Sequence, residues 1–387
     1  MSASVRALGT ESAFTVLARA QALAADGRDI INLGIGQPDF PPPPHVVEAA
    51  IKALRDGHHG YTAANGILEL REAVVRDLKR RRGVTIDPGR VLIVPGGKTT
   101  MFFAITMFAE PGVEILYPDP GFPIYGNLIK YGGATGIALA GSGAPRFSLD
   151  ADAVLAQITE RTRLIILNSP SNPTGNVIPA GEMRRLIEGL RRHPGVHVLS
   201  DEIYARMIYD GAGHVSAFDD DELRQRVILL DGWSKTYAMT GWRLGYGVWP
   251  EELVEPATRL AINSHSCVNA AAQFAGIAAL DGPQDHTGKM ISAFERRRQL
   301  TVDGLNTLPG VTCPMPGGAF YTFPDVTDTG LSATGFQDAM LDDAGVATIA
   351  GTSFGDGGGG HVRVSYANSS DNIERAIGRM AERLKKV

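Results

Sequence analysis

The chain has 387 residues, of which 44% are hydrophobic and 20% are charged, and its formal net charge is −5. This length exceeds one compact core and favours two domains, and the negative charge argues against nucleic acid or an anionic membrane as a partner. Two cysteines, Cys267 and Cys313, form no C-x-x-C motif, so neither a disulfide framework nor a thiolate metal site is expected.

The N-terminal segment "MSASVRALG" lacks the apolar centre of a signal peptide. The longest dense apolar run, residues 101–109, is too short to cross a bilayer. We therefore expect a cytoplasmic protein without a membrane segment. Further along, "PDFPPPPHVVEAAIKAL" begins with prolines that cannot lie inside a helix, which predicts a helix starting near His45.

Five short apolar runs in the middle of the chain predict strands. They are residues 91–96, 114–119, 163–168, 197–202 and 227–232. The runs are almost continuously apolar, which is typical of strands covered on both faces in a largely parallel sheet. Amphipathic segments such as residues 183–190 lie between them. This alternation predicts an α/β fold with a doubly wound, mostly parallel sheet.

The two ends of the chain differ from its middle. A helix with one apolar face is predicted from about Ser370 onward. We expect residues 45–275 to form a large domain. Residues 1–44, as an N-terminal arm, and residues 276–387 are expected to contribute to a smaller α+β domain.

Three further runs have no assigned chemistry. The basic runs at residues 79–82 and 296–298 occur in helical patterns, and we interpret both as solvated helix faces. The run "GDGGGG" (residues 355–360) predicts a flexible loop.

Polar side chains follow several predicted strands. "GGKTT" follows the first, "SPSNPTG" the third, Asp201 and Tyr204 end the fourth, and Lys235 follows the fifth. Ligands of an open parallel sheet bind beyond the carboxyl ends of its strands, and two glycines at a helix N-terminus predict a phosphate cradle. Each motif alone has an alternative, such as a tight turn, a helix cap or a surface lysine. Their joint position at one edge favours a site.

Four motifs together resemble the class I aminotransferases of the fold-type I pyridoxal-phosphate (PLP) enzymes. They are "SPSNPTG", "SDEIY", "WSKTYAMTGWRLGY" and "HVRVSYA". The "AMTGWR" segment is most similar to the bacterial aspartate aminotransferase branch. The resemblance covers nearly the whole chain, beginning with "GIGQPDF" and "YTAANGILELREA". A single motif is weak evidence for the family, but the four motifs at this spacing are strong evidence.

The resemblance implies a role for each residue of the site. Lys235 resembles the lysine that forms the Schiff base with PLP and moves a proton between the substrate Cα and the cofactor. Asp201 resembles the partner of the pyridine nitrogen, which a buried carboxylate keeps protonated. Tyr204 and Asn172 resemble donors to the phenolic oxygen of the ring. Phe122 resembles the aromatic residue that stacks on the ring, although it could also be a core phenylalanine.

The resemblance also implies how the phosphate is held. Arg243 resembles the phosphate-binding arginine, assisted by the amides of Gly97 and Lys98. Tyr61 resembles a tyrosine that reaches the phosphate of a neighbouring subunit, which implies a homodimer with a shared active site.

One position departs from the family pattern. The family usually has a serine three residues before the lysine, where this chain has Gly232. Ser234, Thr99 or Thr100 could supply the missing hydroxyl.

Substrate specificity is implied by fewer residues. Arg363 resembles the fork that binds the substrate α-carboxylate, beside Asn172 and Gly36. Lys98 resembles a lysine that contacts the distal carboxylate of aspartate or glutamate, and Ser12 could assist it. Lys98 could also serve only the phosphate, and aromatic, alanine or arginine-type donors stay open.

Two other functions stay open beside a ping-pong aminotransferase. A lyase, decarboxylase or oxidase on the same fold would carry the same cofactor residues. A ligand-sensing domain of a transcription regulator would need an additional DNA-binding module. No H-E-x-x-H motif occurs, so no metal is expected.

Overall fold

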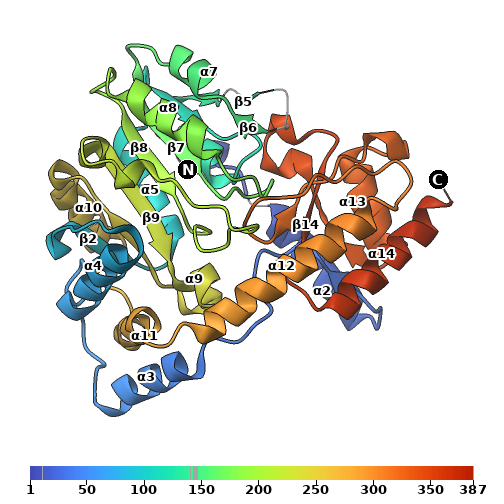
Figure 1. The fold of residues 1–387 in the computed structure, drawn as a ribbon, viewed down its shortest axis with the longest axis horizontal. Helices are drawn as coiled ribbons and strands as arrows, with labels where there is room; N and C mark the ends of the chain where they lie inside the picture. The colour runs from blue at the N-terminus through green and yellow to red at the C-terminus, as the bar shows by residue number, and fades with distance from the viewer. Residues whose placement is uncertain (11, 140, 143–146, 387) are drawn as a thin grey trace.

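The computed structural model describes residues 1–10, 12–139, 141–142 and 147–386. Figure 1 shows a large sheet with helices on both sides, and beside it a region, coloured orange and red, that is formed mainly by the C-terminal part of the chain. The N-terminal helix α2 (Ser12–Ala25) lies against this second region. Among the described residues, no helix combines the length and the apolar character needed to span a bilayer.

Seven strands form the main sheet within the described residues. Their order across the sheet is β2 (Val91–Val94), β10 (Gly245–Val248), β9 (Val227–Gly232), β8 (His197–Asp201), β7 (Thr162–Asn168), β3 (Glu114–Tyr117) and β4 (Thr135–Ala138). Only β10 pairs antiparallel with its neighbours, β2 and β9. The five predicted strands are all present, and β4 and β10 were not predicted.

Two apolar clusters cover the two faces of this sheet. The first cluster includes residues of the helices α4 (Leu68–Arg82), α7 (Ala151–Ala156), α8 (Ala180–Leu190) and α11 (Ala270–Asp281). The second, on the other face, includes residues of α5 (Gly97–Phe108), α6 (Ile124–Gly132) and α10 (Glu251–Ser264). Successive strand residues alternate between the clusters: Ile165 belongs to the first and Ile166 to the second. The predicted doubly wound α/β sheet is confirmed.

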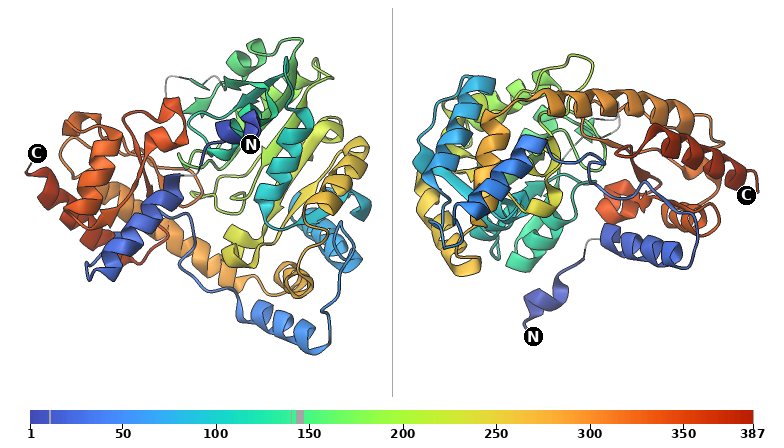
Figure 2. Two further views of the ribbon diagram at one scale, coloured as in Figure 1. Left: turned by 180° about the vertical axis from the view of Figure 1, so that it is seen from behind. Right: turned by 90° about the horizontal axis from the view of Figure 1, so that it is seen from below.

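The second region is built on two small sheets. Its elements are β1 (Ile31–Asn32) paired with β12 (Val346–Ala347), the antiparallel set β11 (Tyr321–Thr322), β14 (Val362–Ser365) and β13 (Ile349–Ala350), and the helices α12 (Asp285–Leu305), α13 (Ala333–Asp342) and α14 (Ser370–Leu384). Ile31 and Leu33 share an apolar cluster with α12, α13 and α14. Figure 2 shows α2 packed beside this region in both views. The domain limits at residues 44/45 and 275/276 stay a prediction.

Two predicted helix starts agree with the structure. The helix α3 (Pro44–Arg55) starts with proline at its first turn, and α14 starts at Ser370 behind the capping side chain of Ser369. Other elements include the short helix α1 (Ala3–Ala7) and the strand pair β5 (Gly141–Ser142) and β6 (Ser148–Leu149).

The interpretation of both basic runs as solvated faces is wrong for three arginines. The side chains of Arg81, Arg82 and Arg298 are 20%, 7% and 5% exposed. Each forms an ion pair with an aspartate or glutamate side chain, for example Arg82 with the buried Glu202. These side chains can be largely withdrawn from solvent because their partners neutralise them, which a local sequence pattern does not reveal.

Candidate active site

The predicted site residues meet at the carboxyl ends of the main sheet, with one exception. One cavity of about 570 Å³ is lined by Gly36, Gly97, Lys98, Phe122, Asn172, Asp201, Tyr204, Lys235, Arg243 and Arg363. In sequence, these residues are spread over more than 300 positions, from Gly36 to Arg363. The exception is Tyr61, whose side chain is 93% exposed and does not line the cavity of its own chain.

Asp201 is a buried acid at the end of β8. Its Oδ2 accepts a hydrogen bond from the Tyr125 hydroxyl at 2.7 Å, and its Oδ1 accepts one from the Ile203 amide at 3.3 Å. Burial raises the pKa of Asp201 to about 6, although both hydrogen bonds favour the ionised form. Tyr125 was not predicted as a site residue. Its position three residues after Phe122, at the start of α6, was the available signal.

The neighbouring acid, Glu202, has the opposite electrostatic environment. Its side chain accepts hydrogen bonds from Ser200, Ser216 and Arg82. Against the cost of burial, the charge of Arg82 is the main cause that lowers the pKa of Glu202 to about 2. His214 lies 3.6 Å from the same carboxylate. The pKa values of these two adjacent acids are therefore shifted in opposite directions. Of the two, only Asp201 lines the cavity.

Lys235 follows β9 in the short helix α9 (Trp233–Thr236). Its Nζ donates a hydrogen bond to the Gly36 carbonyl at 2.6 Å. A Cβ at position 36 would clash with the Tyr321 hydroxyl, so only glycine lets the backbone come this close to Tyr321. The same hydroxyl lies 2.8 Å from that of Tyr204. Burial raises the pKa of the Tyr204 phenol well above its ordinary value.

An anion cradle lies at the first turn of α5. Gly96, with φ of 87°, precedes the helix, and the first turn carries the positive end of the helix dipole. The Arg243 side chain lies directly beside Gly96, so closely that a Cβ at position 96 would clash with it. Arg243 also donates from Nη1 to the Thr240 carbonyl at 2.9 Å. The amides and the guanidinium together favour a bound phosphate or carboxylate.

The structure gives a steric reason for Gly232, at the position where the resemblance implied a serine. A Cβ there would lie 2.9 Å from the Gly245 Cα and 3.2 Å from the Leu244 carbonyl oxygen. Of the three hydroxyl residues considered as replacements, Ser234 lines the cavity, whereas Thr99 and Thr100 do not.

Arg363 presents a buried guanidinium from β14. Its Nη1 donates to Asn172 Oδ1 at 2.7 Å and its Nη2 to the Gly34 carbonyl at 2.6 Å. Its Nε has no hydrogen-bond partner among the described residues. The guanidinium carbon lies 4.6 Å from the centroid of the Tyr321 ring and 4.7 Å from that of Phe354. A buried, unpartnered donor on a cation is well suited to binding a carboxylate.

Lys98 occupies another wall of the cavity. Its Nζ lies 5.1 Å from the centroid of Phe122 and 6.0 Å from that of Phe14 on α2. The Ser12 hydroxyl is buried and has no hydrogen-bond partner within the described part of the chain, but Ser12 does not line the cavity.

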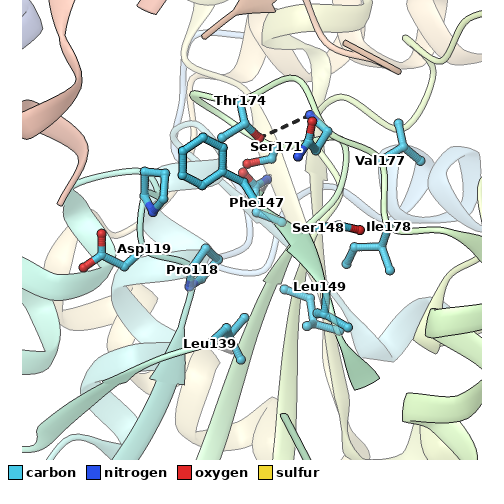
Figure 3. Close-up of a pocket in the computed structure, with 14 residues that line it drawn as sticks. Pro118, Asp119, Leu139, Phe147, Ser148, Leu149, Ser171, Thr174, Val177 and Ile178 are labelled. Carbon is cyan, nitrogen blue, oxygen red and sulfur yellow. Dashed lines mark hydrogen bonds between the residues drawn. The ribbon is translucent and has the colours of Figure 1, made fainter. Parts of the chain in front are cut away.

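A smaller cavity of about 260 Å³ lies beside the main one and shares Asn168 with it. Figure 3 shows its lining, in which hydroxyl side chains such as Ser171 and Thr174 face apolar ones such as Leu139 and Leu149. No predicted site residue lines this cavity.

Comparison with known proteins identifies similar enzymes. A model of the family described as "Aminotransferase class I and II" matches residues 28–380. The aspartate aminotransferase of Geobacillus stearothermophilus is 36% identical, over 97% of this chain and 96% of that protein.

Two solved structures are similar over almost the whole chain. The aspartate aminotransferase of Rhizobium meliloti has a TM-score of 0.93 at 34% identity, covering 100% of this chain and 98% of that one. The aspartate aminotransferase of Thermus thermophilus with maleate has a TM-score of 0.93 at 32% identity, covering 99% of each chain. These findings confirm the predicted fold class and the predicted resemblance.

Proposed function

Because this chain belongs to the class I and II aminotransferases, we propose that it moves an amino group between an L-amino acid and a 2-oxo acid with pyridoxal 5′-phosphate as cofactor. The observation that carries the proposal is one cavity lined by Lys235, Asp201, Arg243 and Arg363. The cofactor has an aldehyde, a basic ring nitrogen and a phosphate. An amine, a buried carboxylate and a cationic cradle fit these three groups, and the cavity has the size of small-molecule sites.

The residues of the chain would hold the cofactor at several points. Lys235 would bind the aldehyde carbon covalently, and Asp201 would pair with the ring nitrogen. Arg243 and the amides of the first turn of α5 would bind the phosphate. Phe122 would cover the ring, and Asn172 and Tyr204 would donate to its phenolic oxygen.

The chemistry then divides between the cofactor and the chain. When bound, the cofactor supplies an electron-accepting ring. The Lys235 amine would move a proton at the substrate Cα, as a general base and acid. Arg363 would bind the substrate α-carboxylate. The Arg363 Nη2 and the Lys235 Nζ both donate to carbonyls of one short segment, those of Gly34 and Gly36, which positions the two side chains relative to each other.

Substrate conversion tests the function directly. Incubation with a panel of amino donors and 2-oxoglutarate is expected to form one glutamate for each donor consumed, which chromatography measures. Release of ammonia or carbon dioxide without matching glutamate would instead indicate a lyase, an oxidase or a decarboxylase.

We further propose a dicarboxylic substrate in at least one half-reaction. Similar proteins named aspartate aminotransferase support this, as does the Thermus thermophilus enzyme with maleate, a dicarboxylate. Lys98 is the residue of the chain that would contact the distal carboxylate, since it lines the same cavity as Arg363.

Replacement of Lys98 by alanine is expected to raise KM for aspartate and glutamate by about 10- to 100-fold, the range of one charge-assisted hydrogen bond. KM for alanine, which lacks a distal carboxylate, is expected to change by less than about twofold, and Lys98→Arg is the matched control that keeps the charge. Steady-state kinetics measure both. Unchanged kinetics with aspartate and glutamate would contradict this role.

We also propose a homodimer with a shared active site. Tyr61 supports it, because this side chain is exposed in the single chain, as are Leu54 and Leu68, which lie seven positions before and after it in the sequence. A molar mass of one chain in light scattering would contradict the proposal.

A cytoplasmic location is likewise proposed, supported by Cys267 and Cys313 being free thiols.

A further inference from the structure

Two loops from different regions of the fold bind each other beside the cavity. One follows β3 and holds residues 118–122, and the other precedes β14 and holds residues 354–357. The Gly357 amide donates to Asp119 Oδ1 at 2.9 Å, and the Gly121 amide donates to the Phe354 carbonyl at 2.8 Å. These hydrogen bonds join the main sheet to the second region at one place.

The glycine run "GDGGGG" makes this approach possible. Gly355 has φ of 119°, a conformation that side chains rarely adopt, and a Cβ there would clash with the Asp119 carboxylate. A Cβ at Gly357 would lie 2.7 Å from the Asp119 carbonyl oxygen. The run was predicted as a flexible loop, but the structure shows one 3₁₀ turn within it, Asp356–Gly358, after another at Gly351–Phe354. Gly355 and Gly357 therefore allow this loop to pack closely against Asp119.

One of the two loops carries a residue of the candidate site, and the other carries a residue that packs against one. Phe122 directly follows Gly121 and lines the cavity. Phe354 packs its ring against Arg363, with 4.7 Å between the ring centroid and the guanidinium carbon. The contact between the loops therefore connects the side chain proposed to cover the cofactor ring with the cation proposed to bind the substrate carboxylate.

We propose that Asp119 is a positioning residue for transamination: by accepting the Gly357 amide, it holds Phe354 and Arg363 in register with Phe122. This inference rests on the proposed function. Figure 3 shows Asp119 at the edge of the smaller cavity, with its carboxylate turned away from the other labelled side chains. Its role is therefore in the contact with the second loop, since Gly357 is its partner there.

Replacement of Asp119 by alanine is expected to raise KM for the amino acid and for the 2-oxo acid by about three- to tenfold, because the lost hydrogen bond affects the substrate only through the position of Arg363, so that part of its free energy is transmitted. The affinity for pyridoxal phosphate and the Tm are expected to stay near those of the unchanged protein. Asp119→Asn is the matched control, because its side-chain oxygen still accepts from Gly357, and it is expected to keep KM within about twofold.

A double-mutant cycle tests whether Asp119 acts through Arg363. In an Arg363→Ala background, Asp119→Ala is expected to change KM by less than about twofold. If Asp119→Ala does not fold, Asp119→Ser, whose hydroxyl ends one atom short of the carboxylate oxygens, is expected to give the same rise in KM. Unchanged KM in Asp119→Ala and Asp119→Ser with Arg363 present, or equal effects of Asp119→Ala with and without Arg363, would overturn the inference.

Failure of the proposed function gives a different result. In that case the unchanged protein would bind no pyridoxal phosphate, which absorbance after dialysis with the cofactor detects, or would not form one glutamate for each amino donor consumed. Cofactor binding and transamination by the unchanged protein, with the same KM in Asp119→Ala, would overturn the role of Asp119 alone.

Discussion

Replacement of Lys235 by alanine is expected to lower transamination by about 10⁴-fold or more, because both the covalent attachment and the proton transfer at the substrate Cα depend on this amine. The cofactor would still bind, since its other proposed partners, Asp201 and Arg243, are unchanged. Borohydride reduction of the unchanged holoenzyme, followed by peptide mapping by mass spectrometry, is expected to show a phosphopyridoxyl group on Lys235. The alanine variant is expected to show none.

The chain offers a matched control for this experiment. Lys98 is the other lysine that lines the cavity among the described residues, and it lies in the phosphate cradle at the start of α5. Lys98→Ala is expected to keep the adduct on Lys235. An adduct on Lys98 in the unchanged protein, or full activity without Lys235, would contradict the assignment.

Local sequence patterns were sufficient to predict where the acid and the amine lie. Asp201 ends the apolar run of β8, and Lys235 follows the end of β9 by three residues. The carboxyl ends of neighbouring parallel strands lie at one edge of a sheet, so the order of runs and polar residues already implied that these side chains meet. The glycines before α5 were predicted in the same way, because only the ends of helices and strands were needed.

The electrostatic surroundings could not be predicted, because they depend on contacts between distant segments. Arg82 on α4 pairs with Glu202, 120 residues further along the chain, and Tyr125 bonds to Asp201 across 76 residues. In the basic run, Arg81 and Arg82 have buried partners, whereas Lys79 is exposed. Four adjacent cations have the same local pattern, so only the fold determines which of them are buried.

Replacement of Asp201 by asparagine is expected to lower kcat/KM by about 10²- to 10³-fold, the usual effect of removing one preorganised charged or hydrogen-bonding group. The amide has nearly the same shape but no charge, so it does not stabilise a protonated ring nitrogen. The comparison therefore measures the charge itself. Steady-state kinetics at pH 8, where the carboxylate of the unchanged protein is ionised, give this number.

The raised pKa of Asp201 gives the same prediction a second measurement. Burial raises this pKa to about 6, so in the cofactor-free protein the carboxylate becomes neutral as the pH falls through 6. A neutral acid does not balance a cationic ring nitrogen. The contribution of Asp201 to the affinity for pyridoxal phosphate, which is the ratio of the affinities of the unchanged protein and Asp201→Asn, is therefore expected to be greatest above pH 6 and to fall below it, by up to tenfold per pH unit.

Two variants separate this titration from other effects of low pH. Asp201→Asn is expected to bind the cofactor weakly and without the change near pH 6. Tyr125→Phe is expected to move the change upward, because the Tyr125 hydroxyl stabilises the ionised carboxylate and so lowers its pKa. Equilibrium binding followed by absorbance between pH 5 and pH 8 measures all three proteins. If Asp201→Asn had the same pH dependence as the unchanged protein, another group would control binding, and the pairing of Asp201 with the ring nitrogen would be wrong.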